Sequence, residues 1–276
     1  MSDTLTVDTA RLPLLLSELR LPTVARLWPD FAERADREGW PAARLLAALA
    51  ELEVAERVQR RIQRHLQEAR LPPGKTLDSF EFAAVPTLSR AQIVALAAGD
   101  SWLEKGTNIL AFGPPGSGKT HIAAALGHAL VDNGFRVLFT RTTDLVQRLQ
   151  AARQDLSLSS AIDKLDKYDL LILDDLSYVH KSQAETSVLF ELISTRYERR
   201  SLMITANQPF GAWDQIFPDK AMTVAAIDRL VHHAVILEMN VESYRRRTAL
   251  TRAVVTSDTA VSPDAVAPAT SSPTPE

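Results

Sequence analysis

Eight consecutive residues carry the most specific chemical pattern in the sequence. Residues 113–120 read Gly-Pro-Pro-Gly-Ser-Gly-Lys-Thr, a full match to G-x-x-x-x-G-K-S/T placed between an apolar run and a helical pattern. Glycines let successive backbone N–H groups surround phosphate oxygens, and the N-terminus of the next helix adds partial positive charge. Lys119 can then reach the β- and γ-phosphates, and the Thr120 hydroxyl can ligate Mg²⁺. The pattern predicts an ATP and Mg²⁺ site; the alternative is a glycine-rich turn without function.

The residues that we expect to contact the nucleotide in this loop are Gly113, Pro114, Pro115, Gly116, Ser117, Gly118, Lys119, Thr120 and the adjoining His121.

Two adjacent carboxylates follow a second apolar run. Leu170–Leu173 is typical of a buried strand, and Asp174 and Asp175 come directly after it, where ligands of parallel α/β sheets bind. We expect Asp174 to hold Mg²⁺ through its water shell beside the nucleotide, and Asp175 to act as general base on the attacking water. Asn207 follows the apolar run 202–205 and could orient the same water. The alternatives are acids that cap a loop and an ordinary turn asparagine.

The elements that must position these residues alternate along the chain. From about residue 77 to 241, short β-rich runs alternate with helical stretches, which predicts an α/β fold with a parallel sheet covered by helices on both faces. A helix from Lys119 to Val131 should follow the first strand and end at Asn133-Gly134, a left-handed cap signal. The expected strands are 108–112, 136–140, 170–173, 202–205 and 235–237.

The first zone of the chain is predicted to be helical. Pro22 and Pro41 stand where first helical turns should begin, and apolar residues from Leu45 to Leu66 recur every three or four positions, which marks a long amphipathic helix. Its other side carries four arginines within about one quadrant, at ~100° per residue, without acids between them. We interpret them as a candidate phosphate-contacting DNA ridge or, alternatively, as a solvated face. These are Arg57, Arg60, Arg61 and Arg64.

Composition limits the remaining classes. The 276 residues carry a net charge of −3 and no cysteine, which excludes disulfides, thiolate catalysis and cysteine metal sites. No segment approaches the roughly 18 consecutive apolar residues of a membrane span, so we expect a cytoplasmic protein. The end of the chain is rich in Ala, Ser, Thr and Pro and is predicted to be disordered. We expect a helical unit at 1–76, an ATPase domain at 77–250 and a tail at 251–276.

The order of these motifs resembles the AAA+ ATPases, and more specifically the IstB family of insertion-sequence transposition helpers. The resemblance covers roughly residues 12–247. It is carried by Leu19-Arg20-Leu21-Pro22, Glu53–Arg57, Gly113–Gly116, Tyr197–Ser201, Thr205–Phe210, Asp228–His233 and Glu242–Arg245. It implies an ATP-dependent homo-oligomer that binds and bends double-stranded target DNA and stimulates a partner transposase.

The resemblance also implies roles for single residues. Asn207 is similar to the family's sensor asparagine, Arg229 to its trans-acting arginine finger, and Arg245 to a second sensor of the ATP phosphates. Many relatives carry Asp-Glu where this chain has Asp174-Asp175, so slower hydrolysis is expected unless a water bridges the missing methylene. The family also lacks the C-terminal helical lid of many AAA+ proteins, which leaves the site to be closed by a neighbouring protomer.

Two other classes stay open. A helicase loader of the same ATPase clade would recruit a helicase through a distinct N-terminal segment, whereas Leu19–Pro22 and Glu53–Arg57 match the helper family. A small-molecule kinase would need a lid or a basic substrate-binding segment, for which the sequence shows no pattern, and this alternative leaves Asn207 and Arg229 unexplained.

Two further features receive structural interpretations. His232 and His233 are adjacent, so on a helix they point about 100° apart. No acidic or histidine partner stands at ligand spacing, and we therefore expect ordinary surface histidines rather than a metal site. Trp213 is predicted to pack in the interior rather than to stack on a base.

Overall fold

A computed structural model describes residues 9–176, 183–208, 213 and 219–241, and its centre is a five-stranded parallel sheet. The strand order is β2-β3-β4-β1-β5. The strands are β1 (Asn108–Phe112), β2 (Val137–Arg141), β3 (Leu170–Asp174), β4 (Ser201–Ala206) and β5 (Ala234–Glu238). Every residue of β1, β3 and β4 is buried, as expected for strands covered on both faces. The predicted strands and the α/β class are confirmed.

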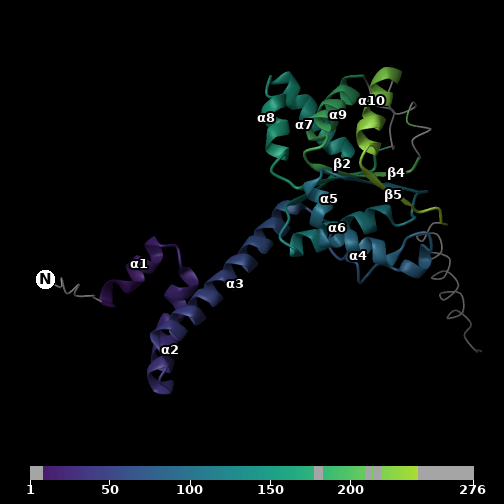
Figure 1. Ribbon diagram of the computed structural model, residues 1–276. Coiled ribbons are helices and arrows are strands. Elements are labelled where there is room, and N and C mark those ends of the chain that lie inside the picture. The colour runs from purple at the N-terminus through teal and green to yellow at the C-terminus, as the bar shows by residue number, and fades with distance from the viewer. Residues whose placement is uncertain (1–8, 177–182, 209–212, 214–218, 242–276) are drawn as a thin grey trace, which may run out of the picture.

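Alternate strand residues pack into two separate cores. Leu110 and Leu171 point to the core beneath α7 (Thr142–Gln154), α8 (Leu158–Leu165), α9 (Gln183–Arg196) and α10 (Lys220–Val231). Ile109 and Ile172 point to the opposite core, beneath α4 (Arg90–Ala98), α5 (Asp100–Glu104) and α6 (Lys119–Asp132). Figure 1 shows the two helical layers on either side of the sheet. Trp213 is fully buried beside Phe112, which confirms that it packs in the interior.

A helical arm, defined as residues 12–69, projects from this α/β unit (Figure 1). After the 3-10 turn η1 (Thr9–Arg11) it consists of α1 (Leu12–Glu18), α2 (Pro22–Glu38) and α3 (Ala42–Ala69). The 28 residues of α3 correspond to a rod of roughly 42 Å at 1.5 Å per residue. One end of α3 packs on the α/β unit through Ile62, Leu66 and Ala69, and α2 packs along the other part. Pro22 begins α2 and Pro41 is the N-cap of α3, as predicted.

Three predictions concern residues outside the described part. The tail at 251–276 and Arg245 fall there, as does the segment where a C-terminal lid would stand, so these predictions stay open. Within the described part, no helix is both long and apolar enough to cross a membrane. A second short helical turn, η2 (Phe82–Ala84), lies in the segment that leads from the arm into the α/β unit.

Candidate nucleotide-binding site

The loop between β1 and α6 needs glycine for steric reasons. A Cβ on Gly113 would lie 2.4 Å from the Met239 carbonyl oxygen, a distance that no side chain tolerates. Gly116 and Gly118 have φ angles of 84° and 99°, in the left-handed region that favours glycine. The close approach of the Met239 backbone, just after β5, and the positive φ angles therefore explain the glycines by backbone geometry.

Two buried polar side chains of the loop are suited to an anionic ligand. Lys119 is 8% exposed, and its Nζ donates to the carbonyl oxygens of Gly113 and Pro114 at 2.7 and 2.9 Å. Ser117 is also buried, and its Oγ has no hydrogen-bond partner among the described residues. A buried ammonium and an unpaired hydroxyl beside the N-terminus of α6 fit a phosphate group, because each gains a strong acceptor there.

A cluster of oxygen atoms stands beside the loop. The Thr120 hydroxyl donates to both carboxylate oxygens of Asp174, at 3.0 and 3.1 Å. From the neighbouring strand β4, the Thr205 hydroxyl donates to Asp174 Oδ1 at 2.7 Å. Mg²⁺ prefers oxygen ligands of this kind, so the predicted metal residues Thr120 and Asp174 lie together and fit that ion. Sequence reasoning missed Thr205; the signal available was its place as the last residue of the apolar run before Asn207.

The second acid, Asp175, begins the loop after β3 in an unusual backbone conformation. Its φ angle is 63°, left-handed, and its N–H donates to the Thr205 hydroxyl at 2.8 Å. Asn207 Nδ2 donates to Asp175 Oδ1 at 3.4 Å, a long hydrogen bond. Aspartate and asparagine tolerate the left-handed region better than other non-glycine residues. The structure thus brings Asp175 and Asn207 together at the carboxyl ends of β3 and β4, beside the loop.

A pocket of about 300 Å³ adjoins the loop on the side of the segment that links the arm to the α/β unit. It is lined by Gly116–His121 and, across from them, by residues that the sequence pattern did not assign to the site: Lys75, Ser79, Phe80, Glu81, Ala84, Val85 and Val241. The mostly apolar wall suits a flat base and a sugar. No pattern in the sequence indicated this wall, because the linking segment has little regular structure.

His121 belongs to the wall of this pocket. Its Nε2 lies 3.1 Å from Ser79 Oγ and 3.3 Å from the Thr76 carbonyl oxygen, and Phe80 meets its ring edge-to-face at 5.3 Å. Burial lowers the pKa of His121, which favours the neutral imidazole at pH 7. It therefore serves the pocket as a hydrogen-bonding and packing group rather than as a cation.

Arg229 lies far from the loop of its own chain. It is in the last turn of α10, where it donates to the Ala225 carbonyl oxygen at 2.8 Å and stacks over Phe190 at 5.1 Å. The residues after α10 lead to the start of β5, and the His233 carbonyl oxygen accepts a hydrogen bond from Asn108, the first residue of β1. The loop follows the last residue of β1, roughly 13 Å further along the strand. Arg229 is thus near the amino-terminal ends of the strands, whereas the loop lies at their carboxyl ends.

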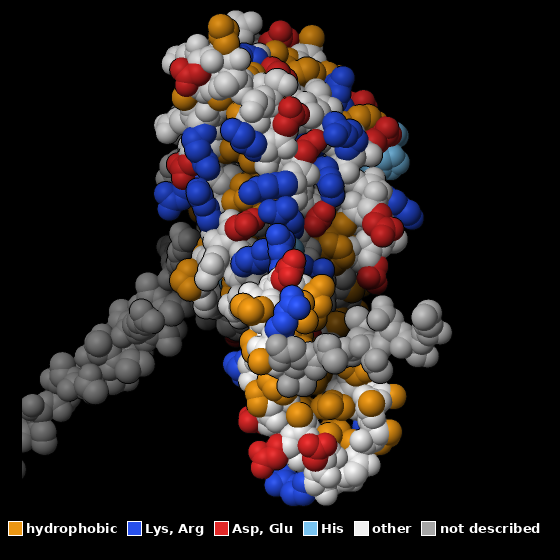
Figure 2. Space-filling view, turned by 90° about the vertical axis from the view of Figure 1, so that its left-hand side faces the viewer, with side chains coloured by type: hydrophobic (Ala, Val, Ile, Leu, Met, Phe, Trp, Pro, Cys, Tyr) orange, Lys and Arg blue, Asp and Glu red, His pale blue; other side chains and the backbone are white. Residues whose placement is uncertain are grey.

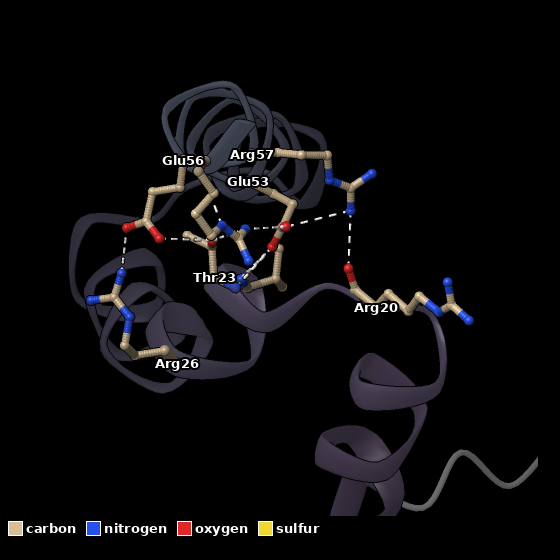
Figure 3. Close-up of polar contacts among 8 residues, drawn as sticks. Arg20, Thr23, Arg26, Glu53, Glu56 and Arg57 are labelled. Atoms are coloured by element: carbon tan, nitrogen blue, oxygen red, sulfur yellow. Dashed lines mark hydrogen bonds and ion pairs between the residues drawn. The ribbon is translucent and has the colours of Figure 1, made fainter. Parts of the chain in front are cut away.

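The four predicted DNA-contacting arginines of α3 are not equivalent, and Figure 3 shows Arg57 paired with Glu53 and with the Arg20 carbonyl oxygen. Arg57 donates to Glu53 Oε1 at 3.4 Å and to the Arg20 carbonyl oxygen at 3.0 Å. Arg60 donates to Glu53 Oε1 at 3.0 Å and to the Thr23 hydroxyl at 3.2 Å. Among the described residues, neither Arg61 nor Arg64 has an ion-pair partner, and both are exposed. Two of the predicted DNA contacts therefore also hold the joint between α2 and α3.

Glu53 is the centre of that joint. It is 3% exposed, and its Oε2 accepts the backbone N–H groups of Thr23 and Val24 at 2.8 and 3.2 Å. Burial alone would raise the pKa of Glu53, but the hydrogen bonds from Val24, Thr23 and Arg60 together hold it below its ordinary value. Because Glu53 caps the first turn of α2, the carboxylate also lies at the positive end of that helix.

The fold and this site define a class of protein: an α/β nucleotide-binding fold of the AAA+ type, with a phosphate-type loop after the interior strand β1 and two adjacent acids at the end of β3. Among solved structures, AMPPCP-bound DnaA from Aquifex aeolicus has a similar fold, with a TM-score of 0.53 and 18% identity over 68% of this chain and 56% of that one.

The chain belongs to the IstB-like ATP binding protein family, whose model matches residues 14–252. It is 73% identical over 245 residues to the insertion sequence ATP-binding protein y4iQ/y4nD/y4sD of Sinorhizobium fredii, covering 89% of this chain and 82% of that one. It is 35% identical over 248 residues to the insertion sequence IS21 ATP-binding protein of Pseudomonas aeruginosa, covering 90% of this chain and 93% of that one.

Proposed function

We propose that this protein is an ATPase that assembles on double-stranded target DNA and stimulates a partner transposase in insertion-sequence transposition. The ATPase part rests on one observation: Lys119, the Thr120–Asp174 pair and the Asp175–Asn207 pair lie together at the carboxyl ends of the strands. Membership of the IstB-like family supports the role in transposition, since its relatives are named as ATP-binding proteins of insertion sequences.

The loop residues would bind the phosphates of ATP. Backbone N–H groups of the loop and the N-terminus of α6 provide donors, and Lys119 can exchange its two carbonyl acceptors for phosphate oxygens, which are stronger acceptors. The pocket beside Phe80 and His121 would take the base and sugar. Thr120 and Asp174 would hold Mg²⁺, which neutralises phosphate charge when bound.

Asp175 is the proposed general base, with Asn207 as its partner. The hydrogen bond from Asn207 to Asp175 Oδ1 leaves the other carboxylate oxygen to accept a proton from water. The Thr205 hydroxyl links both acids, because it accepts from the Asp175 N–H and donates to Asp174. This link fixes the distance between the proposed metal-holding carboxylate and the proposed base.

Arg229 is the proposed arginine finger of a neighbouring protomer. It lies near the amino-terminal ends of the strands, opposite its own loop, and therefore cannot serve that loop. A second copy stacked against the first could present it to the ATP of another protomer. An arginine finger stabilises charge on the transferred phosphoryl group. This arrangement makes ATP hydrolysis dependent on the homo-oligomer.

DNA binding is proposed to use exposed arginines of α3, with Arg61 and Arg64 as the principal phosphate contacts. Figure 2 shows Lys and Arg side chains gathered above the apolar end of the arm, interspersed with Asp and Glu. Contacts of this kind are weak for one protomer but multiply when copies line up along a duplex.

The experiment that tests the function compares wild type with Lys119→Ala and with Lys164→Ala, an exposed lysine on α8 that serves as control. We expect Lys119→Ala to lose ATP binding, measured with a fluorescent analogue, together with hydrolysis and transposase stimulation on target DNA. The control should retain all three. Unchanged ATP affinity in Lys119→Ala would contradict the site, and normal hydrolysis without any effect on the transposase would contradict the helper role.

A further inference from the structure

Three side chains that can ligate a metal ion meet near the amino-terminal ends of the strands, opposite the nucleotide loop. His232 and His233 follow α10, and Glu198 follows α9. Glu198 Oε1 lies 3.6 Å from His232 Nδ1 and 3.7 Å from His233 Nε2. The expectation that the two histidines have no acidic partner is therefore wrong, because the fold supplies Glu198 from another helix. In the part of the chain that the structure describes, this is the one such group of three potential ligands.

The spacing of the three donor atoms is close to what a tetrahedral ion requires. With Zn–N and Zn–O bonds of about 2.0 to 2.1 Å, donor atoms stand roughly 3.3 Å apart. All three donor atoms already lie within 4.8 Å of one another, so small side-chain rotations bring them to one ion. The side chains are about half exposed, at 51 to 52%, which leaves room for water as fourth ligand.

The backbone around the three side chains is held in place. Glu198 has a left-handed φ of 54°, and its carbonyl carbon lies 3.0 Å from where a Cβ of Gly106 would stand, so the two segments are in close contact. The His232 N–H donates to the Asp228 carbonyl oxygen at 3.0 Å, and the His233 carbonyl oxygen accepts from Asn108 at 2.7 Å. Such anchoring limits the ordering that an ion would have to impose on the site.

We propose that Glu198, His232 and His233 form a zinc site, completed by water. Two imidazole nitrogens with one carboxylate favour a borderline transition ion over Mg²⁺ or Ca²⁺, which prefer oxygen ligands. A bound ion joins the end of α9 to the end of α10, the helix that carries Arg229. The site is separate from the Thr120–Asp174 pair, which lies at the carboxyl ends of the strands.

Tyr197 gives the proposal a specific signature. Its hydroxyl lies 2.6 Å from His232 Nδ1, the nitrogen that also faces Glu198. The hydroxyl and an ion compete for the same nitrogen. Replacement of Tyr197 by phenylalanine removes the competitor and leaves the three ligands, so it should leave zinc affinity equal or higher, whereas removal of a ligand should lower it.

The test is zinc titration of the full chain, without a histidine tag and without nucleotide, by calorimetry at pH 7.5. We expect one zinc ion per protomer, unaffected by millimolar Mg²⁺, and an affinity at least tenfold lower in Glu198→Gln and in His233→Gln. His65→Gln, at a histidine of α3 outside the cluster, is the matched control and should bind like wild type. Zinc should also raise the melting temperature of wild type but not of His233→Gln.

The proposal is overturned if Glu198→Gln and His233→Gln keep the affinity of wild type, if His65→Gln loses it, or if Tyr197→Phe binds zinc more weakly. Melting curves without zinc show whether each variant is folded. Because all three ligands are half exposed, these curves should match that of wild type within a few degrees.

Discussion

The Thr205 hydroxyl on β4 donates a 2.7 Å hydrogen bond to Asp174 Oδ1 at the end of β3. The same hydroxyl accepts the Asp175 N–H at 2.8 Å, so one side chain orients both acids of the site. Two neighbouring parallel strands thereby determine where the proposed metal-holding carboxylate and the proposed base stand. A residue of this kind acts through others and is a positioning residue.

Replacement of Thr205 by valine keeps the shape of the side chain and removes both hydrogen bonds. We expect the Mg²⁺ concentration needed for half-maximal ATP hydrolysis to rise by about 10- to 100-fold, as is typical for partners of metal ligands. ATP binding without Mg²⁺ should stay unchanged. Thr195→Val, which removes only a helix-internal hydrogen bond to the Glu191 carbonyl oxygen, is the control. An unchanged Mg²⁺ requirement in Thr205→Val would show that Asp174 does not depend on it.

Asp175 can be tested with two substitutions that separate charge from length. Asp175→Asn should bind ATP and lower turnover by ~10² or more, because it removes the base. Asp175→Glu restores the residue that many relatives are expected to carry, but it must adopt a left-handed φ that glutamate tolerates less well than aspartate. We therefore expect its turnover to lie well above that of Asp175→Asn without large gain over wild type. Equal turnover in wild type and Asp175→Asn would remove Asp175 from the mechanism.

Glu53 makes the helical arm sensitive to acid. Its pKa is lowered in the folded state, so its stabilisation is fully present above the pKa of the unfolded state and is lost as the pH falls through the lower pKa of the folded state. Glu53→Gln should destabilise the α2–α3 joint by about 1–3 kcal/mol at pH 7, because the buried donors lose a charged acceptor.

Hydrogen exchange of residues 22–38 measures this effect at the joint. Glu56→Gln is the control, since Glu56 is 45% exposed and pairs with Arg26 at the surface, where the loss is smaller. The acid dependence of exchange should be weaker in Glu53→Gln than in wild type. Identical exchange in Glu53→Gln and Glu56→Gln would contradict the assignment of Glu53 as the centre of the joint.

The arginines of α3 give a prediction about DNA. Replacement of Arg61 and Arg64 by alanine should make DNA affinity less dependent on salt. The slope of log affinity against log salt concentration should become less steep by roughly 0.9 for each phosphate that a protomer no longer binds. Protein stability should not change, because neither side chain has an ion-pair partner among the described residues. Arg57→Ala with Arg60→Ala should also loosen the joint at Glu53. If the slope for Arg61→Ala with Arg64→Ala equals that of Arg34→Ala, a surface control on α2, the ridge is a solvated face.

The sequence predicted the sheet well because the signals were local. Apolar runs of four to five residues such as 170–173, followed by polar ones, indicate buried parallel strands, and the loop at 113–120 can hardly serve another purpose. The pocket wall at Phe80, the Thr205 link and the Glu198–His233 contact could not be predicted in the same way. Each joins residues from different elements, and only the packing of helices on the sheet brings them together.

The same reason explains the mixed outcome for the arginines of α3. Helical periodicity correctly placed them on one side of a long helix without acids between them. It could not show that Arg57 and Arg60 also donate to the Arg20 carbonyl oxygen and the Thr23 hydroxyl, because those contacts depend on how α2 docks. Charge patterns along one helix therefore predict a face but not its partners.

ATP hydrolysis is proposed to need Arg229 from a neighbouring protomer, and a mixing experiment tests this dependence most directly. Arg229→Ala and Lys119→Ala should each be inactive alone, the first for lack of a finger and the second for lack of bound ATP. Mixed on DNA, they should recover measurable hydrolysis, because the second lends its Arg229 to the intact loop of the first.

The control replaces the second protein with a chain carrying both substitutions, which can co-assemble but has no finger to lend. We predict hydrolysis in the Arg229→Ala and Lys119→Ala mixture and none in the control mixture. If co-assembly is demonstrated by fluorescence transfer and neither mixture exceeds the sum of its inactive components, Arg229 does not act in trans and the proposed mechanism is contradicted.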